Sequence, residues 1–238
     1  ARAGEQLAPM AEMAALGVRI FTDDGTGVQD DRLMRRALEY ASGLDVTLAQ
    51  HCEVTSLSEG TCMHEGEWSS RLGLPGQPSE AEELMVMRDI ALARLTGAKV
   101  HFLHLSTAGS VAMVAAAKAG GLPITAEAAP HHFTLTDACC ANYDATFKVH
   151  PPLRSGSDVA AVATWIEQSG VTCLVASPIA LQKVVERMPD ARGTNALDMV
   201  EIAGGALPAQ VFEVARRRLC ENIVIAWPSL TSIPFEGL

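Results

Sequence analysis

Short apolar runs alternate along the chain with longer segments in which apolar residues recur every three or four positions. The short runs are typical of buried strands, and the longer period is typical of amphipathic helices. The pattern predicts strands at Val18–Phe21, Val46–Gln50, Lys99–Leu103, Pro123–Ala126 and Val171–Ala176. It predicts helices at Asp30–Ser42, Ser79–Leu95, Ala108–Ala119 and Asp158–Gln168. The alternation indicates repeated βα units around a parallel sheet, and therefore an α/β fold.

The segment 79–95 carries signals at both of its ends. Ser79 followed by Glu82 has the form of a capping box, and Gly97 is typical of a helix stop. After Ala176 the pattern loosens, because residues 177–205 mix Pro, Gly and charge without a clear period. Beyond that point only Leu207–Cys220 predicts a further amphipathic helix.

Ionisable residues gather where the predicted strands finish, at Asp23, Asp24, His51, His104, His131 and His132. The chemistry of a (β/α)₈ barrel sits at the carboxyl ends of its strands, so the distribution favours a TIM-barrel-like fold over a doubly wound sheet. Only five strands can be counted, whereas a barrel of this type has about eight. The segment from Cys52 to Pro78 forms an insert between a predicted strand and the next predicted helix. We therefore expect an incomplete barrel containing about strands 4 to 8.

No linker separates two cores, so we interpret residues 1–238 as one partial (β/α) barrel domain whose residues 177–238 form a divergent carboxyl-terminal part. The chain begins at Ala1 rather than Met, which suggests further strands upstream. A barrel removes its sheet edges by closing, so an incomplete one exposes unpaired backbone groups. We expect the chain to be poorly stable alone, or to pair its open edges with another chain.

Composition narrows the functional classes. Hydrophobic residues make up 48% and charged residues 19%, which is the balance of a globular protein. A net charge of −10 and the lack of a basic stripe argue against nucleic acid and anionic membranes as partners. No membrane span or secretory signal is found. Six cysteines without a C-x-x-C pair indicate free thiols in a reducing cytoplasm.

Three candidate metal ligands lie on successive strand ends. Asp23 or Asp24 could bridge two ions, and His51 and His104 could each give one imidazole nitrogen, a ligand set that suits zinc. Taken singly, an aspartate pair before glycine is more often a turn, and a lone histidine is more often structural. We interpret His64 and His101 as structural or surface residues.

Six segments in order resemble the motifs of bacterial dihydroorotases of the long, aspartate-bridged type: FTDDG (21–25), AQHCE (49–53), HEG (64–66), HLSTAGS (104–110), ITAEAAPHH (124–132) and KVHPPLR (148–154). The spacings of 27 residues from Asp24 to His51 and 53 from His51 to His104 are also similar to the family's. The resemblance implies an amidohydrolase fold, with Asp24 as bridging ligand, Asp23 as its alternative, and His51 and His104 as zinc ligands. It places His131 and His132 in the pocket, either to shape it or to bind metal.

Three departures from the family's pattern bear on activity. The H-x-H pair that holds the other zinc is not in this sequence, and Pro178 stands where the resemblance implies the catalytic aspartate. Proline has no titratable group, so it cannot act as a general base. His150 stands where the family has a substrate-binding asparagine, and imidazole cannot offer an amide donor and acceptor together.

Two hypotheses follow, and whether the chain is an enzyme stays open between them. In the first, it is a zinc-dependent cyclic amide hydrolase of pyrimidine biosynthesis, impaired as given, whose substrates are dihydroorotate and N-carbamoyl-aspartate. In the second, it is a non-catalytic dihydroorotase-like subunit that binds a partner such as aspartate transcarbamoylase. A homo-oligomer is compatible with either.

Overall fold

The computed structural model describes residues 5–169, 173–176, 181, 182, 185, 199–203, 208–218 and 223–226. It comprises two compact units, Ala1–Trp165 and Ile166–Leu238, which are considered separately. That both belong to one barrel domain remains a prediction. No helix among these residues is both long and apolar enough to cross a bilayer.

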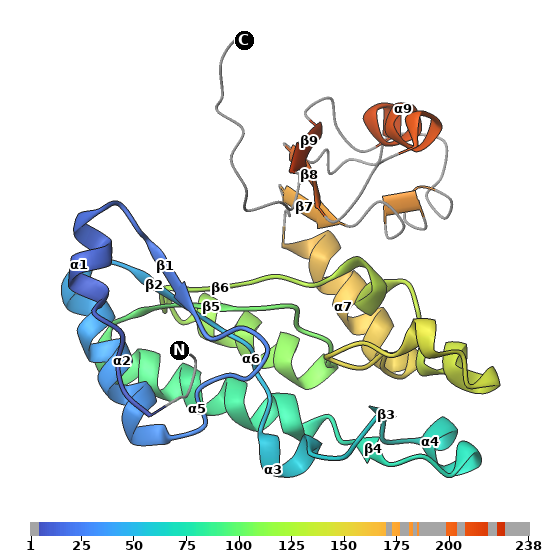
Figure 1. Cartoon of the computed structure of the whole chain (residues 1–238), viewed down its shortest axis with the longest axis horizontal. Helices are drawn as coiled ribbons and strands as arrows, with labels where there is room; N and C mark the ends of the chain where they lie inside the picture. The colour runs from blue at the N-terminus through green and yellow to red at the C-terminus, as the bar shows by residue number, and fades with distance from the viewer. Residues whose placement is uncertain are drawn as a thin grey trace. The chain divides into compact units, whose positions relative to one another are not determined.

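The first unit is built on a parallel sheet of four strands in the order β1-β2-β5-β6 (Figure 1). The strands are β1 (Ile20–Thr22), β2 (Thr47–Gln50), β5 (Lys99–Phe102) and β6 (Ile124–Ala126). The helices that connect them are α2 (Asp31–Leu44), α5 (Glu80–Thr96) and α6 (Ala108–Ala119), and α1 (Met10–Ala15) precedes β1. Four of the five predicted strands and three of the five predicted helices are therefore confirmed here, with shifted ends, and the helix predicted at Asp158–Gln168 is confirmed as Gly156–Gln168.

Helices α2, α5 and α6 pack side by side against one face of this sheet (Figure 1). Leu48, Val100, Phe102 and Ile124 point to that face and are at most 7% exposed. The parallel register aligns Thr22, Ala49, His101 and Thr125 across the other face. A parallel sheet is normally covered on both faces, yet Thr22 and Thr125 are exposed. A sheet with one covered face and one exposed face is expected of a barrel wall that is incomplete.

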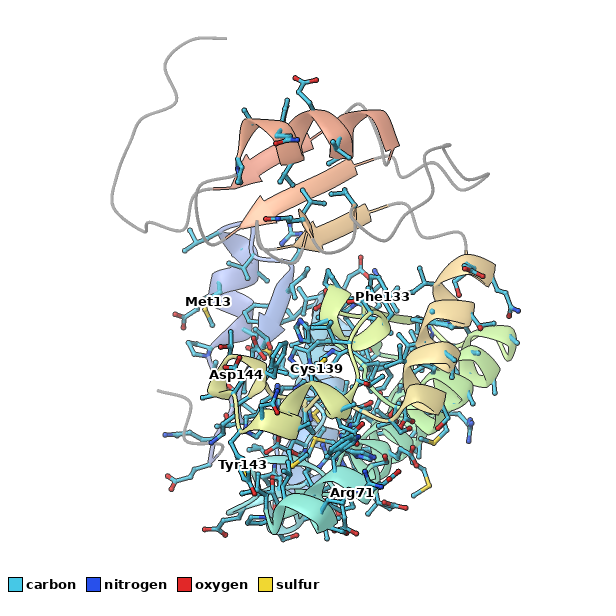
Figure 2. All side chains as sticks on the ribbon, turned by 90° about the vertical axis from the view of Figure 1, so that its right-hand side faces the viewer. Met13, Arg71, Phe133, Cys139, Tyr143 and Asp144 are labelled. Carbon is cyan, nitrogen blue, oxygen red and sulfur yellow. The ribbon has the colours of Figure 1, made fainter. Side chains whose placement is uncertain are left out.

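A long excursion, residues 51–79, separates β2 from α5 and corresponds to the predicted insert. It contains α3 (Thr55–Ser58), β3 (Met63–His64), α4 (Glu67–Leu72) and β4 (Gly76–Gln77), with β3 and β4 paired in parallel. After β6 come three 3₁₀ turns, η1 (Pro130–Phe133), η2 (Asp137–Asn142) and η3 (Ala145–Phe147), and then α7 (Gly156–Gln168). The segment of Cys139 and Tyr143 packs beside α4, where the Tyr143 hydroxyl donates to the Leu72 carbonyl over 2.9 Å (Figure 2).

The capping box predicted at Ser79 is wrong. Ser79 makes no side-chain cap hydrogen bond, and the carboxylate of Glu82 reaches donors near the start of α6. Gly97 does end α5, in the left-handed conformation at φ 70°. Among the described side chains, Cys52, Cys62, Cys139 and Cys140 are free thiols, as predicted.

The second unit contains a parallel sheet in the order β7-β8-β9, formed by β7 (Cys173–Ala176), β8 (Met199–Ala203) and β9 (Ile223–Ala226), together with α9 (Ala209–Arg218). The fifth predicted strand and the last predicted helix are confirmed. β8 and β9 were not predicted, because segments of four or five residues are too short to show a period that separates a strand from other segments. Pro178 lies outside the described residues.

Candidate metal centre at the strand ends

Asp24, His51 and His104 each follow a strand of the first sheet. Asp24 lies two residues beyond β1, His51 directly follows β2, and His104 lies two residues beyond β5. Because β1, β2 and β5 are neighbours and run parallel, their carboxyl ends meet at one edge of the sheet. The topology therefore brings together three side chains that are distant in sequence, as the sequence predicted.

The three ligand atoms form a nearly regular triangle. Nδ1 of His51 lies 3.1 Å from Nε2 of His104 and 3.3 Å from Oδ1 of Asp24, and the remaining edge, from His104 to Asp24, is 3.4 Å. Ligand atoms about 2.0–2.1 Å from a tetrahedral ion lie about 3.3–3.4 Å apart. The triangle therefore fits three corners of a tetrahedral zinc site.

The loop after β1 is shaped so that Asp24 reaches this triangle. Thr22 Oγ1 accepts a hydrogen bond from the Asp24 amide at 3.0 Å, and the Asp23 carbonyl accepts from the amides of Thr26 and Gly27. The turn expected of an aspartate pair is thus made by the backbone of Asp23. The side chain of Asp24, and not that of Asp23, belongs to the triangle.

Gly27 completes this loop at a point where no other residue fits. Its φ of +59° is strained for residues with a Cβ atom, and a Cβ placed there would lie 2.3 Å from the carbonyl oxygen of His51. The loop of one ligand therefore packs directly on the backbone of another.

Burial and neighbouring charges tune the ionisation of the ligands. Partial burial opposes ionisation of Asp24, but the hydrogen bond from His104 and the charges of His104 and His51 lower its pKa. Burial, reinforced by His51, lowers the pKa of His104. A carboxylate beside a neutral imidazole is the protonation state that a metal ion requires of these ligands.

His51 is held on its far side by Glu53. Nε2 of His51 lies 3.5 Å from Oε2 of Glu53, and the Ser58 hydroxyl donates to the same carboxylate at 2.6 Å. The hydrogen bond from His51 is the main cause that lowers the pKa of Glu53 to about 2. Nδ1 of His150 lies 3.5 Å from Glu53, so His150 is joined to the centre through this carboxylate. Sequence reasoning missed Glu53, although its place two residues after a ligand was a usable signal.

His131 and His132 form a pair of rings beside the centre. Their centroids are 4.2 Å apart in an edge-to-face arrangement, and Nε2 of His132 lies 3.0 Å from the Pro151 carbonyl. Burial, and secondarily His104, lowers the pKa of His131. Neither histidine belongs to the ligand triangle. That they shape the pocket stays a prediction.

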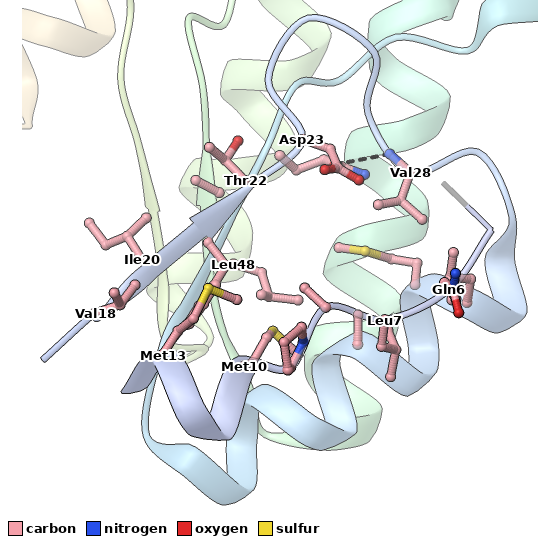
Figure 3. Close-up of a pocket in the computed structure, with 18 of the residues that line it drawn as sticks. Gln6, Leu7, Met10, Met13, Val18, Ile20, Thr22, Asp23, Val28 and Leu48 are labelled. Atoms are coloured by element: carbon pink, nitrogen blue, oxygen red, sulfur yellow. Dashed lines mark hydrogen bonds between the residues drawn. The ribbon is translucent and has the colours of Figure 1, made fainter. Parts of the chain in front are cut away.

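A cavity of about 820 Å³ lies next to β1 (Figure 3). Apolar side chains such as Leu7, Met10, Met13 and Leu48 line it, and Asp23 stands at its wall. Asp24, His51 and His104 are not part of its lining. The cavity is therefore a separate feature from the ligand triangle.

Comparison with known proteins identifies the relatives of this chain. Residues 1–110 match the family model described as Dihydro-orotase-like. The chain is 55% identical over 159 residues to the dihydroorotase of Pelotomaculum thermopropionicum, a match that covers 67% of this chain and 37% of that protein. It is 48% identical over 174 residues to the dihydroorotase of Mycobacterium tuberculosis, covering 72% of this chain and 40% of that protein. The chain belongs to the dihydroorotase-like family.

The dihydroorotase-like chain also resembles solved structures. A crystal structure of D-hydantoinase superposes with a TM-score of 0.58 at 18% identity, over 71% of this chain and 40% of that one. The D-hydantoinase of Bacillus sp. AR9 gives 0.55 at 20% identity, over 67% of this chain and 37% of that one. At these identities the likeness is one of fold alone, and it agrees with the TIM-barrel-like fold that the sequence predicts. The chain spans less than half the length of these relatives and structures.

Proposed function

We propose that this chain supplies the Asp24–His51–His104 part of a zinc centre that hydrolyses a cyclic amide, interconverting dihydroorotate and N-carbamoyl-aspartate in pyrimidine biosynthesis. The observation that supports it most directly is the triangle of ligand atoms, with edges of 3.1–3.4 Å, that suits zinc. Motif likeness and the dihydroorotase relatives support the choice of substrate.

Zinc bound at these residues would supply an acidified water and a Lewis acid for the amide carbonyl. The residues of the chain prepare the site for it. Burial of His104 favours its neutral form, and Glu53 fixes the orientation of His51 from the outer side. His150, 3.5 Å from Glu53, is the candidate substrate contact, and His131 and His132 shape the adjacent wall.

One feature of the sequence limits the rate that we expect. Pro178 occupies the place that the family likeness gives to the catalytic aspartate. Without that carboxylate, no proton acceptor of this kind serves the attacking water, so turnover should be slow. The retained triangle nevertheless favours an enzymatic centre over a non-catalytic dihydroorotase-like subunit that binds a partner such as aspartate transcarbamoylase.

Metal analysis of the purified chain tests the centre. We expect about one zinc per chain, as three protein ligands and a water can hold one ion. His51→Ala and His104→Ala should each lose that zinc, whereas His101→Ala, on the same strand as His104 but outside the triangle, should retain it. Less than one equivalent in the wild type, with no further loss in the two ligand variants, would defeat the assignment.

Hydrolysis of dihydroorotate, followed by loss of the ring's ultraviolet absorbance, tests the reaction. We expect Pro178→Asp to raise the rate above that of the unaltered chain, because it restores a titratable group. Zinc-loaded Pro178→Asp protein that hydrolyses no ring would count against the enzyme. Co-elution of that inactive protein with aspartate transcarbamoylase would then favour the subunit hypothesis.

A further inference from the structure

A buried pair of opposite charges lies behind the metal centre. Glu82 on α5 and Arg154 in the KVHPPLR segment are each 1% exposed, and Nη2 of Arg154 lies 3.9 Å from Oε2 of Glu82. Charged groups this far from water are unfavourable unless other groups are arranged to bind them. The hydrogen bonds that the two side chains make therefore indicate what the pair holds in place.

The Glu82 carboxylate binds the two residues that follow the loop of His104. It accepts from the Ser106 amide at 3.0 Å and from the Thr107 amide at 3.2 Å. It also accepts from the hydroxyls of Ser106 and Thr107. All four donors belong to residues two and three positions after His104, at the amino-terminal end of α6, where a negative charge is favoured. One carboxylate thus fixes both the backbone and the side chains of this loop.

Arg154 ties the same loop to the rest of the unit. Its Nε donates to Ser106 Oγ at 3.0 Å, and its Nη1 donates to the Gln77 carbonyl at 3.1 Å and contacts Nδ1 of His64 at 3.3 Å. These partners join the excursion between β2 and α5 to the turn that carries His104. Arg154 also balances the charge of Glu82, so neither group is left buried alone.

His104 needs such support because of its backbone. Its φ is +34°, in the left-handed region that residues with a Cβ atom rarely adopt. Such conformations persist only when the surroundings fix them, and they cluster at functional sites. The neighbouring Leu103 and Leu105 amides bond to the carbonyls of Gln50 and Glu127, and the Glu82 carboxylate fixes the other end of the turn.

We propose that Glu82 and Arg154 form a positioning pair for the metal ligand His104. Neither residue touches the ligand triangle; they act through Ser106 and Thr107, which hold the turn so that Nε2 of His104 stays 3.1 Å from Nδ1 of His51. The inference rests on the proposed function, since it concerns the same zinc centre. It assigns α5 and the KVHPPLR segment a role in metal affinity.

The zinc affinity of the full chain, measured by competition with a chromophoric chelator, tests the inference. Loss of outer partners typically lowers metal affinity about 10–100-fold, and we expect Glu82→Gln to fall in this range. The control is Glu80→Gln, which makes the same change at an exposed position on the same helix and should stay within about twofold of wild type. The visible spectrum of the cobalt-substituted protein should change for Glu82→Gln, since it reports the geometry of the ligands.

Ser106→Ala is the second variant, for the case in which Glu82→Gln does not fold. It removes one acceptor of Arg154 and one donor to Glu82 while leaving the two buried charges together. We expect a smaller loss of affinity in the same direction. Urea unfolding of the metal-free proteins separates positioning from general destabilisation, because a merely structural role would lower the free energy of unfolding while the folded fraction bound zinc normally.

Different outcomes overturn different claims. A wild-type chain that binds no zinc would overturn the proposed function, and this inference with it. A wild-type chain that binds zinc, together with folded Glu82→Gln and Ser106→Ala proteins of unchanged affinity and cobalt spectrum, would overturn the positioning role alone.

Discussion

His51 faces Glu53 on one edge of its ring and the other two ligands on the opposite edge. Nε2 lies 3.5 Å from the Glu53 carboxylate, while Nδ1 lies within 3.3 Å of both His104 and Asp24. A carboxylate that binds the outer nitrogen of a metal-bound histidine fixes the ring and its tautomer. Glu53 is therefore placed to keep the proton of His51 on Nε2. Nδ1 then carries the lone pair that the proposed zinc site would use.

Glu53→Gln should lower zinc affinity by about 10–100-fold, because the amide binds the outer nitrogen more weakly than the carboxylate does. The matched control is Glu59→Gln, at an exposed position six residues further on. Competition with a chromophoric chelator measures both variants. Equal affinities for the two would show that His51 needs no partner on that side.

The aspartate pair offers a second prediction. Asp24→Asn should lower zinc affinity by at least about tenfold, since an amide oxygen carries no charge to offset that of the ion. Asp23→Asn makes the same change next to it, and should stay within about twofold because its side chain is outside the triangle. The reverse order of the two affinities would identify Asp23 as the bridging ligand.

Gly27 offers a prediction on stability. Gly27→Ala should lower the free energy of unfolding by more than about 1 kcal/mol, because φ is +59° and the new Cβ would meet the His51 carbonyl at 2.3 Å. It should also weaken zinc binding, since that carbonyl belongs to a ligand.

Gly43→Ala is the control for this change. It lies in α2 with no atom within 4 Å of the added Cβ, and should stabilise the chain by about 0.4–1 kcal/mol. Urea unfolding of both variants measures the difference. Similar changes in the free energy of unfolding for the two variants would mean that the loop after β1 accommodates the added Cβ without strain.

The ligand triangle could be predicted from the sequence because it depends on topology. Once β1, β2 and β5 are neighbours in a parallel sheet, residues just after them must converge, and Asp23, Asp24, His51 and His104 are ionisable residues there. Parallel βα units have a strong periodic signature, so the sheet of the first unit was predictable too. Loop geometry was not: the choice of Asp24 over Asp23 follows from a turn of a few hydrogen bonds.

Long-range hydrogen bonds explain where sequence reasoning was wrong. Glu82 three residues after Ser79 satisfies a local capping rule, but two amides and two hydroxyls 24 and 25 residues away bind its carboxylate instead. The buried partner of that carboxylate, Arg154, is more distant still. No period or short motif encodes such an arrangement, because it depends on how α5, α6 and the KVHPPLR segment pack.

His132 gives a prediction on pH. Burial, then the charge of His131, lowers its pKa to about 3 from an ordinary value of 6.5. Between these values the unfolded chain binds a proton that the folded chain does not, so stability falls as the pH drops below 6.5, by at most about 1.4 kcal/mol per pH unit from this group. His132→Asn should destabilise the chain at pH 7.5, and its loss of unfolding free energy relative to wild type should shrink toward pH 5.

The control is Thr134→Val, which removes the hydrogen bond to the Pro130 carbonyl without changing a titratable group. It should show the same deficit in unfolding free energy at both pH values. Urea unfolding curves at the two pH values measure these deficits, and a His132→Asn deficit that does not change with pH would mean that His132 is not held neutral in the folded chain.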